Sequence, residues 1–559
     1  MKSRLLSICV VALAVLAIAR TAPAQAPVKN VIVLIVDGCG GEQYTLARWF
    51  RGRPLALDEI LVGGVRTYIA DSVVPDSAPA ATAYATGQRS NDNFLSVGPA
   101  PSKHAVAPIQ PELAYRPLAT ILEGAHLDGR STGVVVTCRI SHATPAAFMA
   151  HVPLRSLESE IVEQAMHQPV DVLFGGGRDL FLPKAKKGKR ADGKDFWELA
   201  GQQGRQRVQT RDEMLALKAS PALGLFAMGP LAAEIDRPRR RPSEPTLAEM
   251  TGKAIELLSS NPKGFFLMVE GSQVDWACHA NDPAQMLSDL LAFDDAVRTA
   301  LDFARRDGQT LVLAMSDHNT GGMSIGNTRS NSKYAEMGIE DLVGPLRGMK
   351  ASAPTLWALA VAPKSVEEAK PADASPEKIQ LVVKEHWGLD ITEADARQIA
   401  EAIRKNPGSP QNAFAEILCA KYTNIGWTTH GHTGGDVPLF AFGPGKPAGL
   451  YEAPSIGRLA MTALGIDRDA LNARLFVDAA AALPQAKIAV ENISGSPVAS
   501  IIQGGRRAEL AVNTNRMILD GKAIELEGLV LYATATKKLY IPRQAVALIS
   551  GEPSGGAKE

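Results

Sequence analysis

Uninterrupted apolar runs recur along most of this chain, with segments of helical spacing between them. Residues 31–36 read Val-Ile-Val-Leu-Ile-Val, which is typical of a strand buried on both faces of a parallel sheet. Similar runs occupy residues 133–137, 170–174, 265–269, 311–315 and 437–442. Residues 247–258 and 283–305 instead repeat apolar positions at helical spacing. The alternation predicts an α/β fold with a mostly parallel central sheet and helices on both faces.

Two segments depart from this rhythm. Residues 323–427 contain helical patterns at 376–386, 392–404 and 411–421, which predicts a largely helical insertion that could cover a site or a subunit interface. From residue 486 onward, short β-type runs alternate with turn signals such as Asp520-Gly521. We therefore expect a main domain over residues 27–485 and a small β-rich appendage with a frayed tail over 486–559.

The N-terminus has the features of an export signal. Lys2 and Arg4 precede an apolar stretch over residues 5–18, and small residues around Ala26 offer a cleavage site. This pattern predicts a signal peptide over residues 1–26 and an exported protein, periplasmic or secreted. The apolar stretch is short for a membrane span and the sequence shows no other, so we expect no transmembrane segment.

Composition narrows the class of protein. The chain has 559 residues, enough for a large α/β domain with additions. Its 59 Lys and Arg balance 59 Asp and Glu, which gives no support to nucleic acid as a dedicated partner. Beyond the signal the cysteines are Cys39, Cys138, Cys278 and Cys419. Export permits disulfides, but four cysteines allow three pairings and buried free thiols fit equally well.

Candidate ligands for a cation follow the predicted strands. In an open parallel sheet, ligands bind beyond the carboxyl ends of the strands. Four strand ends lead to such side chains: Asp37, the segment from His142 to Thr144, Glu270, and the pair Asp317-His318. One acidic residue at a strand end is ordinary. Several on one edge would be costly to bury without cations, and a metal cluster removes that cost.

Two further motifs add candidate chemistry. Asp275 and His279 are four residues apart, so on a helix they share a face and suit Zn²⁺, although alone they could be a surface pair. Asp76 and Ser77 precede small residues at a predicted helix start. Helix N-termini favour anions, and a serine there could attack phosphorus once a metal lowers its pKa. The alternative for Ser77 is an N-cap without catalysis.

A third histidine-bearing segment is the glycine-rich loop before residues 437–442, which holds His430 and His432. Taken together, the motifs resemble those of the alkaline phosphatase family in order and spacing from about residue 28 to 475. The matching pieces are Asp37-Gly38, Asp76-Ser77-Ala78, His142-Ala143-Thr144, Glu270-Gly271, Asp275 with His279, Asp317-His318 and His432. The resemblance implies hydrolysis of small phosphate monoesters through a phosphoserine, with two Zn²⁺ and one Mg²⁺, and leaves room for a homodimer.

Carried over position by position, the resemblance implies three metal sites. One zinc site would comprise Asp275, His279 and His432, a second would comprise Asp37, Asp317 and His318 with Ser77 as its reactive ligand, and the magnesium site would comprise Asp37, Thr144 and Glu270. Arg155 stands at the family's spacing for a clamp on two phosphate oxygens.

Three residues are expected beside these ligands without binding metal themselves: His430, His142 and Trp276. His432 is preferred to His430 as the ligand because its spacing to Val437 matches the family. His142 and Trp276 occupy places that are aspartate and lysine in other members. Trp276 cannot supply a cation to phosphate through water, and His142 could weaken magnesium retention.

Other functions remain open at this level. A sulfatase would need an arginine that the segment after Ser77, Ala78-Pro79-Ala80-Ala81, lacks. A phosphodiesterase of the same superfamily usually lacks the third metal site, for which Thr144 and Glu270 argue. An exported binding protein acting through the β-rich appendage is a further alternative, since residues 518–543 faintly resemble a small β module of copper amine oxidases and bacterial surface proteins.

Overall fold

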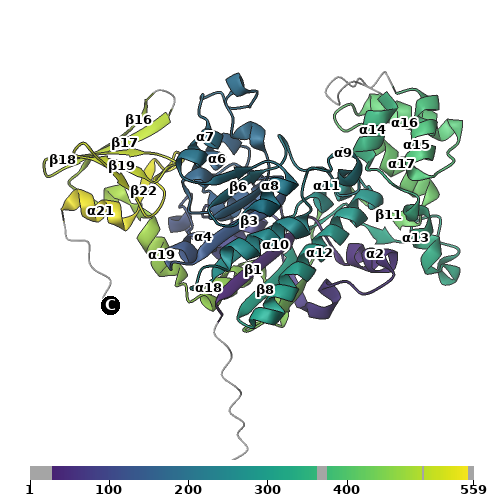
Figure 1. Cartoon of the computed structure of the whole chain (residues 1–559), viewed down its shortest axis with the longest axis horizontal. Coiled ribbons are helices and arrows are strands. Elements are labelled where there is room, and N and C mark those ends of the chain that lie inside the picture. The colour runs from purple at the N-terminus through teal and green to yellow at the C-terminus, as the bar shows by residue number, and fades with distance from the viewer. Residues whose placement is uncertain (1–27, 107, 362–373, 494–495, 552–559) are drawn as a thin grey trace, which may run out of the picture.

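The computed structural model describes residues 28–106, 108–361, 374–493 and 496–551. The predicted signal peptide and all of the predicted tail except Gly551 therefore lie outside the described residues. A ten-stranded sheet crosses the middle of the molecule in the order β14-β2-β13-β8-β1-β7-β3-β4-β6-β5 (Figure 1). Its strands are β1 (Asn30–Val36), β2 (Leu61–Arg66), β3 (Ser131–Arg139), β4 (Val172–Gly176), β5 (Gln206–Val208), β6 (Ala222–Leu225), β7 (Phe265–Gly271), β8 (Thr310–Ser316), β13 (Val437–Phe442) and β14 (Gly449–Glu452).

The sheet is mostly parallel, as predicted. Strand β1 lies between β7 and β8 and runs parallel to both, and every residue of all three strands is buried. Strand β13 differs, because it pairs antiparallel with β8 and with β2. The predicted fold class is confirmed. All six predicted strands are present, whereas β2, β5, β6 and β14 escaped prediction because glycines or polar residues interrupt their apolar positions.

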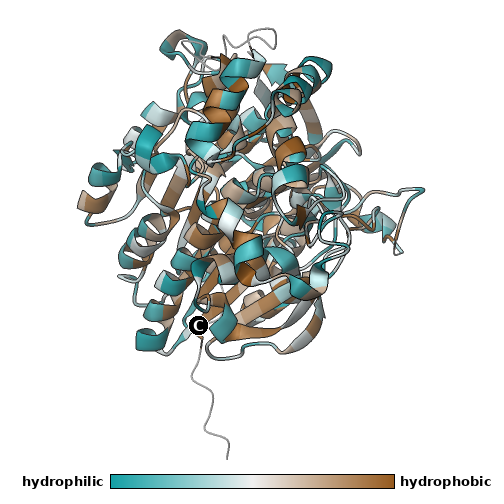
Figure 2. Ribbon diagram, turned by 90° about the vertical axis from the view of Figure 1, so that its right-hand side faces the viewer, coloured by the Kyte–Doolittle hydropathy of each residue, from teal (hydrophilic) through white to brown (hydrophobic). Residues whose placement is uncertain are grey.

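Helices cover both faces of the sheet. Alternate residues of β1 belong to two hydrophobic clusters: Ile32, Leu34 and Val36 face one, and Val31, Val33 and Ile35 face the other. The first cluster includes residues of α2 (Gly41–Arg51), α10 (Leu247–Leu258) and α12 (Pro283–Asp307). The second includes residues of α3 (Ser77–Thr86), α4 (Ile121–Leu127), α5 (Ala143–Met149), α6 (Glu158–His167) and α18 (Ala453–Ala463). Figure 2 shows hydrophobic and hydrophilic residues alternating along the outer helices.

The segment between residues 323 and 427 is largely helical, as predicted. Antiparallel pairing of β10 (Ser324–Ile325) with β11 (Ile425–Gly426) closes its base. The predicted helices correspond to α15 (Pro376–Trp387), α16 (Glu393–Lys405) and α17 (Asn412–Tyr422), and α13 (Ile339–Arg347) and α14 (Ala353–Val361) add two more. These helices gather beside α2 and α9 (Arg237–Arg240), at the right of Figure 1.

The C-terminal region, which we call the C-terminal module (residues 486–551), is β-rich. It contains an antiparallel sheet of β16 (Lys487–Ile493), β17 (Ser496–Gln503), β18 (Arg506–Ala511), β19 (Arg516–Leu519) and β20 (Lys522–Glu525), and α21 (Arg543–Ser550) packs on it. A second sheet joins β21 (Leu531–Ala533) and β22 (Lys538–Ile541) to β15 (Val477–Asp478). This second sheet crosses the predicted boundary at residue 485, so the module is attached through backbone pairing as well as through the chain.

The remaining elements are α7 (Phe196–Gln202), α8 (Arg211–Ala216), α11 (Gln273–His279), α19 (Arg468–Leu475), α20 (Ala479–Ala482), β9 (Asn319–Thr320) and β12 (His432–Thr433).

The expectations about the cysteines and about membrane-spanning segments can be compared with this fold. Cys39, Cys138, Cys278 and Cys419 are all free and buried, which agrees with the alternative of buried thiols rather than a disulfide framework. Among the helices of the described residues, none combines the length and the apolar character needed to cross a bilayer.

Candidate active site

The carboxyl ends of three adjacent strands bring the predicted acidic residues together. Val36 of β1 is in register with Gly271 of β7 and with Ser316 of β8, so Asp37, Glu270 and Asp317 lie at one edge. All three acidic side chains are fully buried. The turn after Asp37 needs a glycine. Gly38 has φ +74°, and a Cβ there would lie 2.6 Å from Asp275.

The first cluster of potential metal ligands consists of Asp37, Asp317 and His318, whose ligand atoms lie within 4.8 Å of one another. His318 Nε2 is 3.6 Å from Asp37 Oδ1 and 3.4 Å from Asp317 Oδ2. Asp317 Oδ1 accepts the Gly38 and His318 backbone N–H groups, which leaves Oδ2 for the cluster. Burial, then the charges of nearby carboxylates, raise the pKa of Asp37 well above its usual range.

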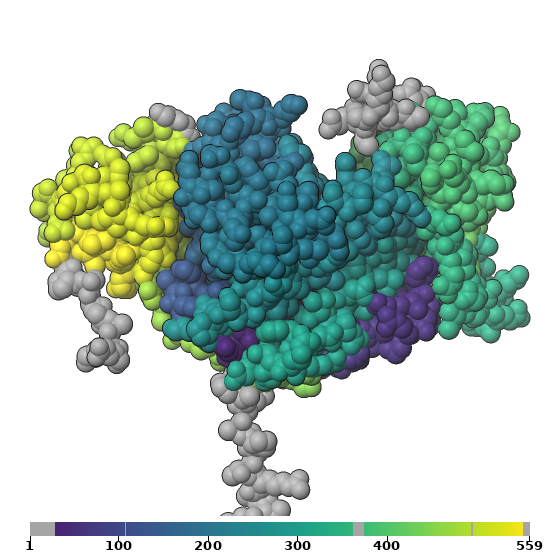
Figure 3. All heavy atoms as spheres, in the orientation of Figure 1, coloured from purple at the N-terminus to yellow at the C-terminus, as the bar shows by residue number. Residues whose placement is uncertain are grey.

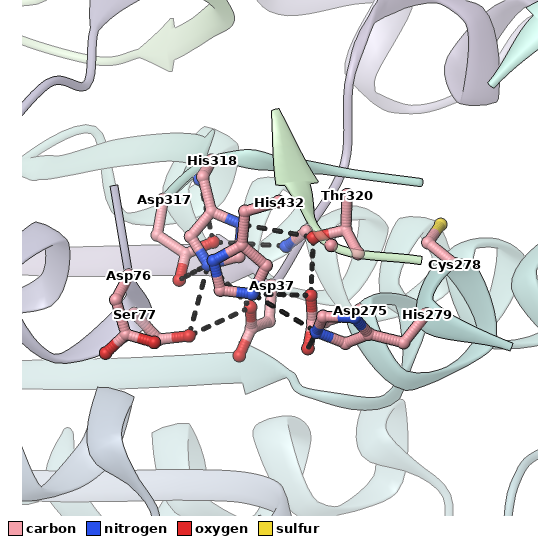
Figure 4. A network of polar contacts seen from close by, with 12 residues as sticks. Asp37, Asp76, Ser77, Asp275, Cys278, His279, Asp317, His318, Thr320 and His432 are labelled. Carbon is pink, nitrogen blue, oxygen red and sulfur yellow. Dashed lines mark hydrogen bonds and ion pairs between the residues drawn. The ribbon is translucent and has the colours of Figure 1, made fainter. Parts of the chain in front are cut away.

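The second cluster consists of Asp275, His279 and His432 (Figure 4). His279 Nε2 lies 3.2 Å from both Asp275 Oδ2 and His432 Nε2. The Nδ1 atoms of the two imidazoles contact backbone carbonyls, of His430 and of Pro75, so each Nδ1 is the donor and each Nε2 faces the cluster. Burial acts to raise the pKa of Asp275, but the His279 hydrogen bond and neighbouring imidazole charges lower it overall.

The third cluster contains one residue that the sequence did not suggest. Cys138, His142 and Glu270 place their ligand atoms within 4.8 Å of one another, and Cys138 Sγ donates to Glu270 Oε2 at 3.3 Å. The Thr144 hydroxyl is near enough to lower the Glu270 pKa slightly, yet makes no well-formed hydrogen bond. Burial nevertheless raises the pKa of Glu270 to about 7. Burial and the charge of Arg155 lower the pKa of His142 to about 4.

Ser77 lies between the first cluster and a helix N-terminus. It is the first residue of α3, and the Asp76 side chain caps the helix by accepting the Ala78 N–H at 3.3 Å. The Ser77 hydroxyl is 3.1 Å from His318 Nε2 and 3.5 Å from Asp37 Oδ1. Every residue of α3 is buried, and small side chains allow this helix to pack tightly against α5. An anion beside Ser77 would meet the positive end of the helix dipole.

Arg155 reaches this helix start from the segment after α5. Its Nη1 donates to both Asp76 carboxylate oxygens, at 2.6 and 2.7 Å, and its Nη2 lies 3.3 Å from His142 Nε2. Burial opposes ionisation of Asp76, but the charge of Arg155 outweighs it and lowers the Asp76 pKa. Trp276 packs edge-on against His142 with ring centroids 5.6 Å apart. The Arg155 guanidinium therefore bonds to Asp76, the residue that directly precedes Ser77 in the sequence.

His430 and Thr320 occupy supporting places. His430 lies outside the second cluster: its Nδ1 is 2.8 Å from the His279 carbonyl, and its side chain is 41 % exposed. Thr320 donates to Asp275 Oδ1 at 2.5 Å and lies 3.2 Å from His318 Nδ1, so it links two clusters. Sequence reasoning missed Thr320 and Cys138. Their only signal is closeness in sequence to Asp317-His318 and to the end of β3.

The donor set fits metal ions. At this site four buried oxygen atoms find no hydrogen-bond partner among the described residues: Asp37 Oδ2, Thr144 Oγ1, Glu270 Oε1 and Asp317 Oδ2. Buried, unpaired carboxylates are costly, and a cation compensates them directly. Imidazole with carboxylate suits Zn²⁺, and the hydroxyl and carboxylate oxygens around Glu270 suit Mg²⁺.

Known proteins are similar to this chain in sequence and in fold. The family model described as alkaline phosphatase matches residues 28–466. Alkaline phosphatase 3 of Bacillus subtilis is 34% identical over 461 residues, which cover 79% of this chain and 90% of that protein. The crystal structure of Thermus thermophilus alkaline phosphatase superposes with a TM-score of 0.68 at 28% identity, covering 80% of this chain and 94% of that one. A histidine-to-aspartate variant of TAB5 alkaline phosphatase, solved with Mg bound, gives a TM-score of 0.55 at 26% identity over 79% and 99% of the two chains.

A sheet edge that gathers carboxylates and imidazoles around a helix-initiating serine, together with these relatives, defines a metal-dependent phosphate ester hydrolase. The chain belongs to the alkaline phosphatase family. It is accordingly a phosphatase, and hydrolysis of phosphate monoesters is the reaction that its relatives imply.

Proposed function

We propose that this phosphatase works through a phosphoserine formed on Ser77. The observation that carries the proposal is the position of the Ser77 hydroxyl, at a helix N-terminus and 3.1 Å from an imidazole of the first cluster. In the first step Ser77 Oγ bonds to phosphorus, the ester P–O bond breaks, and the alcohol leaves. In the second step water attacks the phosphoserine and releases inorganic phosphate, which restores the serine.

The first two clusters and the oxygen atoms around Glu270 are the proposed metal sites. Asp275, His279 and His432 would hold one zinc ion, and the first cluster, Asp37 with Asp317-His318, would hold the other. Glu270 and Thr144, with Asp37, would hold magnesium. Bound there, the metals would supply Lewis-acid stabilisation of the charges that develop on the attacking, transferring and leaving oxygens.

The chain's own groups orient the phosphate. The positive end of the α3 dipole favours an anion bound beside Ser77, while the Ala78 N–H is already accepted by Asp76. Asp76 already holds the Arg155 guanidinium through Nη1. The remaining N–H donors of the guanidinium can bind two phosphate oxygens as a fork. Asp76 therefore has two roles in the proposal: it caps the Ser77 helix and keeps Arg155 in place.

We propose that His142 makes the magnesium site of this protein different from that of relatives with an aspartate there. Mg²⁺ prefers oxygen ligands, and an imidazole beside Glu270 offers nitrogen instead. The Mg-bound TAB5 variant carries aspartate in place of a histidine, and we propose that His142 occupies the corresponding place. Magnesium retention would then be weaker here than in relatives with an aspartate.

Substitution of the nucleophile tests the mechanism. Ser77→Ala should fold normally, lose phosphate labelling of the protein at low pH, and lower kcat by at least about 10³-fold. Ser72→Ala, a serine of the preceding loop, is the matched control and should label like wild type. Phosphate bound covalently to Ser77→Ala at the wild-type level would exclude this serine as the nucleophile. A parallel assay with a diester separates the monoesterase from a phosphodiesterase.

Three wider expectations stay proposals. They are export through a signal peptide over residues 1–26, a homodimer, and the division into a main domain and a C-terminal appendage near residue 485. The appendage as a separate binding unit for phosphate or cell wall is the alternative role for residues 486–559. Mass analysis of the secreted protein's N-terminus and light scattering of the purified enzyme test the first two.

A further inference from the structure

The C-terminal module contacts the core on the side where the Arg155 segment lies. The module lies against the region of α6 and α7, at the left of Figure 3, and a cavity of about 170 Å³ separates part of the two surfaces. Core residues 151–153 and 157 line this cavity from one side, and residues 513 and 531–535 of the module line it from the other. Arg155 is therefore only two residues from this seam.

A turn of the module enters the seam and makes a buried polar contact. Asn513, between β18 and β19, has φ +67°, and its N–H donates to the Val530 carbonyl at 2.8 Å, which fixes the turn to the module. Its Oδ1 accepts from Gln164 Nε2 of α6 at 3.0 Å. Asn513 is 9% exposed and Gln164 is buried, so this hydrogen bond is shielded from water.

Gln164 also forms hydrogen bonds with the backbone segment that leads to Arg155. Its Oε1 accepts the His151 N–H at 2.7 Å, and its Nε2 also lies 3.4 Å from the His151 carbonyl oxygen. One residue further, Val152 exchanges both backbone hydrogen bonds with Leu95. The chain from residue 151 to 152 is thus held on two sides.

The same segment ends at Arg155. The Arg155 N–H donates to the Asn93 carbonyl at 3.0 Å, and its guanidinium holds Asp76. A series of hydrogen bonds, joined by the backbone of residues 151–155, therefore runs from Asn513 through Gln164 to the cap of the Ser77 helix. Because the first member lies outside residues 28–466, the part matched by the family model, this brace depends on the module of this chain.

We propose that Asn513 is a positioning residue for Arg155, so that the C-terminal module sets how tightly the active site holds phosphate. The proposal rests on the role proposed above for Arg155 as the phosphate clamp. The module is then a structural part of the phosphate site rather than a separate binding unit. Loss of the Asn513 amide would leave Gln164 Nε2 with only its long contact to the His151 carbonyl oxygen and loosen the 151–155 segment.

The test is inhibition by inorganic phosphate, measured in the full-length metal-loaded enzyme. Asn513→Gly removes the amide and keeps a residue that tolerates positive φ. We expect its Ki for phosphate to rise about tenfold, since small displacements of a clamp are costly, with a smaller change in kcat. Asp520→Gly, in another positive-φ turn whose hydrogen bonds with Arg507 stay inside the module, is the control and should leave Ki unchanged.

A double substitution separates positioning from general destabilisation. In an Arg155→Ala background, Asn513→Gly should add nothing further to Ki, because the group it positions is gone. Additive effects, or an unchanged Ki in Asn513→Gly, would refute the proposal. An unchanged Ki in Arg155→Ala alone would instead refute the clamp itself, so the two failures are distinguishable. If Asn513→Gly does not fold, Gln164→Met, which removes the same brace from the core side, must show the same rise and the same masking by Arg155→Ala.

Discussion

Replacing His432 with alanine should remove one of three protein ligands from the proposed site with Asp275 and His279. His432 Nε2 is 3.2 Å from His279 Nε2 and 3.6 Å from Asp275 Oδ1, so it faces the shared point directly. Structural zinc sites with four ligands gain about 10–16 kcal/mol, or roughly 2.5–4 kcal/mol per ligand. The loss of one ligand should therefore weaken zinc binding by about 10²–10³-fold.

His430→Ala is the matched variant, two residues away in the same loop. The contact that orients His279 Nδ1 is made by the backbone carbonyl of His430, which the substitution keeps. The substitution removes the contacts of the His430 ring with the His279 carbonyl and, at 3.5 Å, with Glu416, at a side chain that is 41% exposed. We expect activity to fall by no more than about tenfold, at the lower end for a group that supports a ligand.

The assay is elemental analysis after dialysis against a buffered zinc concentration, with kcat/KM measured on the same samples. His432→Ala should contain about one zinc fewer per chain than wild type and regain activity only at high added zinc. His430→Ala should keep its zinc. Full zinc in His432→Ala with depletion in His430→Ala would reverse the assignment. Full zinc in both would show that the loop holds no metal, and the two-zinc site would have to be rebuilt.

Three other substitutions test separate parts of the site and fold. Arg155→Ala should weaken inhibition by inorganic phosphate by about 1.5–3 kcal/mol, the contribution of a charge-assisted contact, measured as Ki; an unchanged Ki removes Arg155 from the site. His142→Asp should raise the magnesium content per chain, since it replaces nitrogen by oxygen beside Glu270; equal magnesium in both proteins would contradict this. Burial and the charge of Arg516 lower the pKa of His167 to about 4, so the unfolded chain takes up this proton first as pH falls below about 6.5. Between pH 6.5 and 5 the free energy of unfolding should drop by up to about 2 kcal/mol on this account; urea titrations should show a smaller drop in His167→Gln, and equal drops would refute the assignment.

The strand ends show why much of the site could be predicted. A buried parallel strand needs an uninterrupted apolar run, and the first polar residue after it must lie at the carboxyl edge. Asp37 and Glu270 follow such runs immediately, and Asp317 follows one after a single serine, so their convergence follows from the pattern. The helical pair Asp275 and His279 is equally local, because a spacing of four places both on one face.

Contacts between distant segments could not be predicted in this way. Cys138 and Thr320 are polar residues near motifs, and nothing local distinguishes them from ordinary loop residues until Glu270 and Asp275 are placed opposite them. The pairing of Arg155 with Asp76 joins residues that are 79 positions apart, and it depends on how α5 packs against α3.

The sequence by itself determined the class of fold, the six strands with long apolar runs, the helical character of residues 323–427 and most of the proposed ligands, because these depend on local periodicity and on residues that follow strands directly. The family's spacing favoured His432 over His430, but only the tertiary structure showed what orients the chosen ring, since the contact is made by the distant Pro75 carbonyl. It alone also placed Asn513 against Gln164, because a contact across 349 residues is set by packing and leaves no periodic trace in either segment.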